Sequence, residues 1–122
     1  MAGTLTISTL SDGTNSTSST NCIQGSAKAW VQFTGSTATI NGSYNASSIT
    51  RSAAGAYTVN FTNALSNANY AICLGCSRDA FDSAHGIYSY IYTAQTTSSV
   101  GLRFYIYDLQ TDPTTFSVSI LR

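Results

Sequence analysis

The ionisable side chains best placed to do chemistry lie together in one segment, SRDAFDSAHG, which spans residues 77–86. Asp79, Asp82 and His85 could coordinate a cation or act as acid and base. A glycosidase, however, holds two carboxylates about 5–9 Å apart on a rigid frame, whereas both carboxylates here belong to one polar loop. We therefore expect a solvated loop or a loop that contacts a ligand, rather than a catalytic centre.

Other signatures of catalysis or metal binding are missing from the chain. His85 is the only histidine, and neither a GxSxG nucleophile turn nor a glycine-rich phosphate loop occurs. Cys73 and Cys76 have CxxC spacing without a second ligand pair, and residues three apart on a strand face opposite sides. We expect these two thiols and Cys22 to be reduced, as core or neutral thiols. The sequence thus predicts no catalytic residue, no metal site and no cofactor.

Tyrosine is concentrated in the last third of the chain. Two segments there each carry three large side chains at alternating positions: Tyr88, Tyr90 and Tyr92 in the first, and Arg103, Tyr105 and Tyr107 in the second. If the two segments are neighbouring strands, these side chains form one broad amphipathic surface, larger than a monomer usually exposes. Such a surface packs in a core, covers another subunit or stacks on ligand rings, and the sequence leaves these three alternatives open.

The elements that must position these residues are strands. Apolar and polar residues alternate with period two, and no window keeps the helical spacing for three turns. We predict nine strands, at residues 4–10, 26–33, 37–43, 46–51, 56–62, 70–75, 86–92, 100–108 and 115–121. This pattern indicates an all-β fold, an antiparallel β-sandwich or jelly roll. We expect one domain over residues 1–122, in which residues 1–24 form an extended N-terminal strand and linker.

Composition excludes several classes of partner. Only 8% of the residues are charged, the formal net charge is zero, and the five Lys and Arg residues are scattered. Nucleic acid and anionic membranes are therefore poor partners, because both require clustered basic residues. The sequence has neither an apolar run long enough to span a membrane nor a basic, apolar leader. We expect no membrane insertion, no signal peptide and folding in a cytoplasm.

Three sequence segments resemble a module found near the C-termini of bacteriophage tail-fibre and related virion appendage proteins. They are the opening TLTISTLSDGTNSTSSTNCIQGSAKAW, the strand GSAKAWVQF at residues 25–33, and SYNASSITRSAAGAYTVNFTNALSNANYAI at residues 43–72. The resemblance depends on the order and spacing of these segments and ends near Cys73. It implies a homotrimer in the virion tail fibre, folded in the host cytoplasm, that attaches to a host surface polysaccharide or lipopolysaccharide.

Ligand contacts are then expected on end loops and the adjoining strand ends. The residues that we predict to contact the glycan are Arg78, Asp79, Phe81, Asp82, His85, Tyr105 and Tyr107, with the last two as stacking partners. The resemblance supplies no catalytic motif, so we expect a binding protein and not an enzyme. Two alternatives remain open: a structural virion protein without a ligand, such as a head decoration, collar or fibre cap, and a polysaccharide depolymerase.

Overall fold

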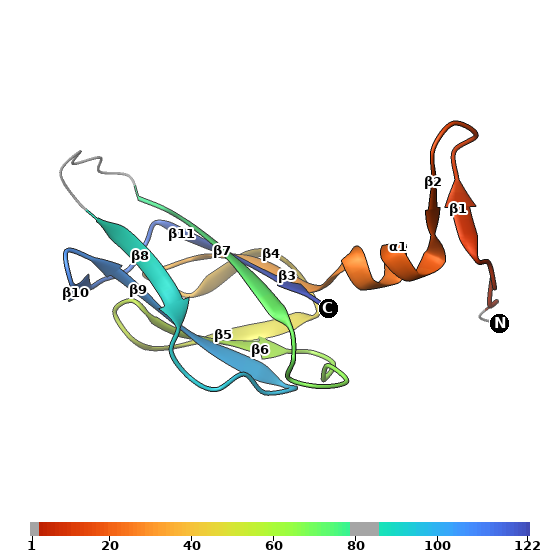
Figure 1. The fold of residues 1–122 in the computed structure, drawn as a ribbon. Helices are drawn as coiled ribbons and strands as arrows, with labels where there is room; N and C mark the ends of the chain where they lie inside the picture. Colours follow the sequence, from red (N-terminus) through yellow and green to blue (C-terminus); the bar gives the residue numbers. More distant parts are fainter. Residues whose placement is uncertain (1–2, 79–85) are drawn as a thin grey trace.

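Two antiparallel sheets pack face to face in the computed structural model, which describes residues 3–78 and 86–122 (Figure 1). Strands make up 56% of the chain and the single helix of the described residues is short. The predicted all-β sandwich is therefore confirmed. Within the described residues, no helix has the length and apolarity that a membrane span requires.

Each sheet of the sandwich has four main strands. In the first sheet the order is β4 (Thr39–Tyr44), β3 (Ala27–Thr34), β11 (Thr115–Leu121) and β7 (Ala71–Ser77). In the second sheet the order is β5 (Ala46–Ala53), β6 (Ala56–Phe61), β9 (Ser99–Ile106) and β8 (Ile87–Ile91). The short strand β10 (Leu109–Gln110) folds back on the end of β9. Eight of the nine predicted strands correspond to these elements.

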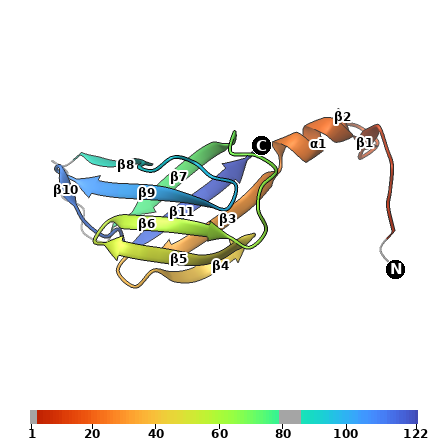
Figure 2. The same ribbon diagram turned by 90° about the horizontal axis from the view of Figure 1, so that it is seen from below.

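The turns divide between the two ends of the sandwich (Figure 2). One end, which we call the distal end, carries the turns at residues 35–38, 54–55 and 107–108, together with Arg78 and Gly86. The N-terminal helix and the C-terminus lie at the opposite end. The distal end is therefore the end that points away from the rest of the chain.

Alternation along the strands builds the core between the two sheets. In β9, Val100, Leu102, Phe104 and Ile106 are buried, whereas Arg103 and Tyr105 point outward and are only partly covered. Strand β11 repeats the pattern with the buried residues Phe116, Val118 and Ile120, and β3 does so with Ala29, Val31 and Phe33. Because the side-chain period of a strand is two, one face of each strand enters the core and the other remains for contacts outside it.

The N-terminal segment differs from its prediction. The strand expected at residues 4–10 forms only at its end, as β1 (Thr9–Ser11), which pairs with β2 (Ser16–Ser18). The linker then contains the helix α1 (Ser19–Gly25), where the Ser18 side chain accepts a hydrogen bond from the Asn21 amide. Ser and Asn favour such caps because their side chains satisfy free backbone amides, which pattern reading alone missed. None of residues 3–26 is buried.

Stability should therefore reside in the sandwich and not in the N-terminal segment. Removing residues 1–25 should change the free energy of unfolding by less than about 0.5 kcal/mol, as expected for surface changes. Phe104→Ala should lower it by about 3–5 kcal/mol, because it empties a fully buried site. Chemical denaturation of the two variants beside the full chain measures both effects. A truncation that costs as much as Phe104→Ala would show that the segment supports the core.

Candidate functional site

Pairing of β8 with β9 brings the tyrosines of the two strands together on the outside of the sandwich. Tyr88 lies opposite Tyr105 and Tyr90 lies opposite Arg103. The rings of Tyr88 and Tyr105 are parallel within 2°, with their centroids 5.2 Å apart. The Tyr90 ring lies 5.8 Å from Tyr105 and 6.3 Å from Tyr88, again nearly parallel to both. The two tyrosine segments are therefore neighbouring strands, which is the condition on which one shared aromatic surface depended.

Arg103 extends this cluster toward the end of β8. Its guanidinium carbon lies 3.9 Å from the centroid of the Tyr92 ring, in a cation–π contact. Tyr88, Tyr90 and Tyr92 are 42%, 40% and 57% exposed, which excludes the core alternative for them. We call the set Tyr88, Tyr90, Tyr92, Arg103 and Tyr105 the tyrosine face.

Hydrogen bonds orient the rings of the tyrosine face. The Tyr88 hydroxyl donates to the Asp108 carboxylate at 2.9 Å, and the Tyr105 hydroxyl donates to Oε1 of Gln110 at 3.0 Å. The hydrogen bond to Asp108 and partial desolvation raise the pKa of Tyr88. The pKa of Tyr90 is raised mainly by its hydrogen bond with Tyr105. These phenols therefore remain neutral and amphipathic at neutral pH.

Beyond the tyrosines, the same side of the sheet is covered by hydroxyl and amide groups. Asn60 of β6 donates from Nδ2 to the side-chain oxygens of Ser48 and Thr50 on β5, at 3.0 Å each. Thr58 lies between Thr50 and Gly101 in the strand register. The outer side of this sheet thus joins an aromatic area to an uncharged hydrogen-bonding area, a combination that suits polar ring-shaped ligands.

The residues predicted to contact a ligand are only partly within the described structure. Asp79, Phe81, Asp82 and His85 lie outside the described residues, so their placement stays a prediction. Arg78 is exposed and directly follows β7 at the distal end. Tyr105 belongs to the tyrosine face. Tyr107 does not, because it leaves β9 in a turn with a φ of 53° and its amide donates to the Gly86 carbonyl oxygen.

The two cysteines of the CxxC spacing face opposite sides of β7, as predicted. Cys73 lies opposite Ser119 on the outer face, and Cys76 lies opposite the core residue Phe116. Both are exposed, as is Cys22 in α1, so of the two predicted alternatives, core or neutral thiols, the core alternative is wrong. Cys73 points away from the core, and Cys76 remains exposed on β7, which is an edge strand. Partial burial raises the pKa of Cys76, which keeps this thiol protonated.

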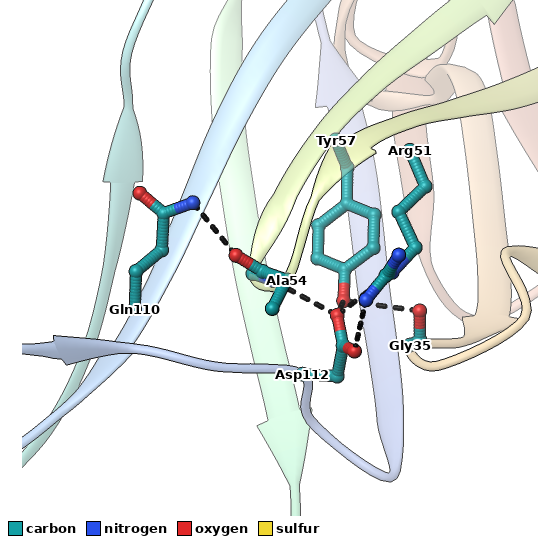
Figure 3. Close-up of polar contacts among 7 residues, drawn as sticks. Gly35, Arg51, Ala54, Tyr57, Gln110 and Asp112 are labelled. Atoms are coloured by element: carbon teal, nitrogen blue, oxygen red, sulfur yellow. Dashed lines mark hydrogen bonds and ion pairs between the residues drawn. The ribbon is translucent and has the colours of Figure 1, made fainter.

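A polar cluster around Asp112 connects the turns of the distal end (Figure 3). Arg51 donates from Nε and Nη2 to the two oxygens of Asp112, at 3.1 and 2.6 Å. The Gly55 amide donates to Oδ1 at 2.8 Å, and the Tyr57 hydroxyl donates to the same oxygen. That hydroxyl also lies 3.1 Å from the Gly35 carbonyl oxygen. Strand β6, two turns and the segment before β11 are thus fixed to one carboxylate.

The sequence analysis missed this cluster, since Asp112 lies between the predicted strands at residues 100–108 and 115–121 and belongs to no motif. Two glycines make it possible. Gly55 has a φ of 67°, and a Cβ there would collide with the Thr111 carbonyl oxygen, while a Cβ on Gly35 would collide with Pro113.

Burial raises the pKa of Asp112, but the hydrogen bonds from Arg51, Tyr57 and Gly55 together outweigh this effect and lower the pKa. The carboxylate is saturated with donors, so its role is structural.

Comparisons with known proteins add no assignment to these sites. No family model, no curated protein and no solved structure matches the chain. Within residues 3–78 and 86–122, no three His, Cys, Asp or Glu side chains lie together as a metal would require. The tyrosine face and the residues of the distal end are therefore the candidate functional surfaces.

Asp112→Asn should lower the free energy of unfolding at neutral pH by about 1–2 kcal/mol. A hydrogen bond to a charged acceptor stabilises the fold more than one between neutral groups. Solvent screening lowers this contribution here, because Asp112 is only partly buried. Because folding lowers the pKa of Asp112, its contribution is complete above the unfolded-state pKa of about 3.9 and disappears as the pH falls through the folded-state value. Thermal melts from neutral to acidic pH should therefore show the two proteins converging only below about pH 4.

Asp12→Asn is the control for this titration, because it removes one negative charge from the N-terminal segment outside the sandwich. It should leave the melting of the sandwich unchanged at neutral pH. A difference between the protein and Asp112→Asn that stays constant down to the lowest pH would contradict the assigned role of the carboxylate.

Proposed function

We propose that this chain is a glycan-binding domain of a phage tail fibre, which attaches the virion to a polysaccharide or lipopolysaccharide of the host surface. The observation that carries the proposal is the tyrosine face, where the exposed rings of Tyr88 and Tyr90 stack with the half-buried ring of Tyr105 on the outside of a sheet. The resemblance of residues 4–33 and 43–72 to tail-fibre modules agrees with it. So does the uncharged, hydroxyl-rich composition.

The chemistry of sugars fits this surface. A pyranose ring has an apolar C–H face that packs on an aromatic ring, and hydroxyl groups at its rim that need donors and acceptors. Tyrosine offers both an apolar ring and a polar tip. The side chains of Ser48, Thr50 and Asn60 lie on the same side of the sheet. Arg103 adds a cation next to the exposed ring of Tyr92.

The position of the face supports attachment. Strand β8, which carries Tyr88 and Tyr90 of the tyrosine face, begins at the distal end, while the N-terminal segment and the C-terminus lie at the opposite end of the sandwich (Figure 1). In the sequence, the predicted contact residues Arg78 to His85 stand between the end of β7 and the start of β8. Contact at each site would be weak, and several copies on one fibre would bind by avidity.

An array of bacterial surface polysaccharides and lipopolysaccharides, probed with the purified chain, tests this function. Tyr90→Ala/Tyr105→Ala should weaken binding at least tenfold, because two stacking contacts of about 1 kcal/mol each are removed. Tyr44→Ala is the control, since Tyr44 is also an exposed strand tyrosine, 59% exposed against 40% for Tyr90, but lies on the opposite sheet. It should bind like the unaltered chain, and all three proteins should melt alike.

Two results would contradict the proposal. If the unaltered chain binds no glycan on the array, the structural virion protein becomes the better interpretation. If incubation with a bound polysaccharide releases new reducing ends, the chain is a depolymerase and the expectation of a non-enzymatic protein is wrong.

A further inference from the structure

The outer edge of β8 presents free backbone groups in a regular pattern. The Tyr92 amide donates to the Gly101 carbonyl oxygen, and the Tyr107 amide donates to the Gly86 carbonyl oxygen. In an antiparallel ladder the hydrogen-bonded pairs alternate, so residues 86, 88, 90 and 92 bond to β9. The N–H and C=O groups of Ile87, Ser89 and Ile91 therefore point away from β9, toward an edge that no described strand covers.

This edge lacks the features that usually prevent strands from pairing. Natural edge strands are interrupted by bulges, charged side chains or proline, and β5 at the other side of the sheet has two register shifts and Arg51. Strand β8 has an uninterrupted register and neither a charge nor a proline. It also exposes apolar side chains on both faces, with Ile87 50% and Ile91 42% exposed opposite the tyrosines.

The sequence of β8 is Ile-Tyr-Ser-Tyr-Ile, which reads the same in both directions around Ser89. We propose that β8 pairs antiparallel with β8 of a second copy of this chain, about a twofold axis through Ser89. In that register Ile87 lies opposite Ile91 of the other copy, and Tyr88 lies opposite Tyr90. Each side chain then lies opposite a side chain of the same residue type. Both copies use the same surface, as in an isologous interface.

The outward N–H and C=O groups of the backbone can also form hydrogen bonds about the same twofold axis. Ile87, Ser89 and Ile91 are placed symmetrically about Ser89, so each of their outward N–H groups meets an outward C=O of the second copy. Tyr88 and Tyr90 then form the non-hydrogen-bonded pairs, in which side chains approach most closely. In a register shifted by one residue, the N–H and C=O groups that point outward from one β8 would lie opposite residues of the other β8 whose groups point to their own β9. These hydrogen bonds would then be lost.

The charges beside the strand are complementary under this symmetry. Asp108 is bonded to Tyr88 near one end of β8, and Arg103 lies opposite Tyr90 nearer the other end. Antiparallel pairing brings the Asp108 end of each copy to the Arg103 end of the other. Attraction between the two ends therefore favours the antiparallel arrangement over a parallel one.

The proposal of glycan binding does not depend on this pairing. Edge-to-edge contact does not cover the outer side of the sheet, so the tyrosine face stays open and continues into that of the second copy. A twofold axis through Ser89 differs from the threefold axis that the tail-fibre resemblance implies. The number of copies in solution therefore distinguishes the two assemblies.

Ser89→Pro is the direct test, with Ser89→Ala as its matched control. Proline removes an N–H that points to the open edge and is not bonded to β9, so the fold should tolerate it. Light scattering over a dilution series should give two copies for the unaltered chain and for Ser89→Ala, and one copy for Ser89→Pro. A single copy throughout for the unaltered chain, or three copies that Ser89→Pro leaves unchanged, would overturn the pairing.

Two charge variants test the register and remain informative if proline disturbs the fold. Ile87→Lys/Ile91→Lys places lysine opposite lysine across the axis and should give a single copy. Ile87→Glu/Ile91→Lys places glutamate opposite lysine twice and should keep two copies at low salt. Equal masses for these two variants would show that the copies do not meet in this register. Glycan binding measured on the same variants reports separately on the tyrosine face.

Discussion

One side chain, Tyr57, connects the apolar core to the polar cluster of the distal end. Its ring packs edge-on against Phe33 at 5.0 Å and Phe116 at 5.9 Å, between the two sheets. Its hydroxyl reaches Asp112, and burial together with that carboxylate raises the pKa of Tyr57 far above its ordinary value. The aromatic packing holds the sheets together, while the hydroxyl ties the turns to them. A buried phenol must find such a partner, because an unsatisfied hydroxyl in the core is costly.

The same end of the molecule also positions the tyrosine face. Gln110 donates from Nε2 to the Ala54 carbonyl oxygen at 2.6 Å, beside the Asp112 cluster, and accepts a hydrogen bond from the Tyr105 hydroxyl. Tyr107 and Asp108 have positive φ values that reverse the chain between β9 and β10. This reversal brings Asp108 to the Tyr88 hydroxyl. The exposed rings are thus held through contacts that begin in the core.

The sandwich was predictable because its strands alternate strictly. Val100, Leu102, Phe104 and Ile106 sit at every second position, so the pattern showed that these four share one face of β9 and that Arg103 and Tyr105 share the other. Which of the two faces enters the core came only from the structure. Contacts between side chains and backbone far apart in the chain carry no periodic signal. The bonds from Arg51 to Asp112 join residues 61 positions apart, and pattern reading could not foresee them. The helix α1 was missed because its seven residues, with Ile23 as the one large apolar side chain, are too few to show a helical spacing of apolar residues.

Strand β3, which receives the chain from the N-terminal segment, lies inside its sheet between β4 and β11. It runs from the N-terminal end of the sandwich to the distal end, and its hydrogen bonds lie across that direction. A tension applied to the chain ahead of Ala27, while the distal end is held, acts along β3. This tension loads the hydrogen bonds on both sides of β3 in shear. These bonds must then break together and not one after another. The placement of this strand therefore favours mechanical resistance along the long axis of the sandwich.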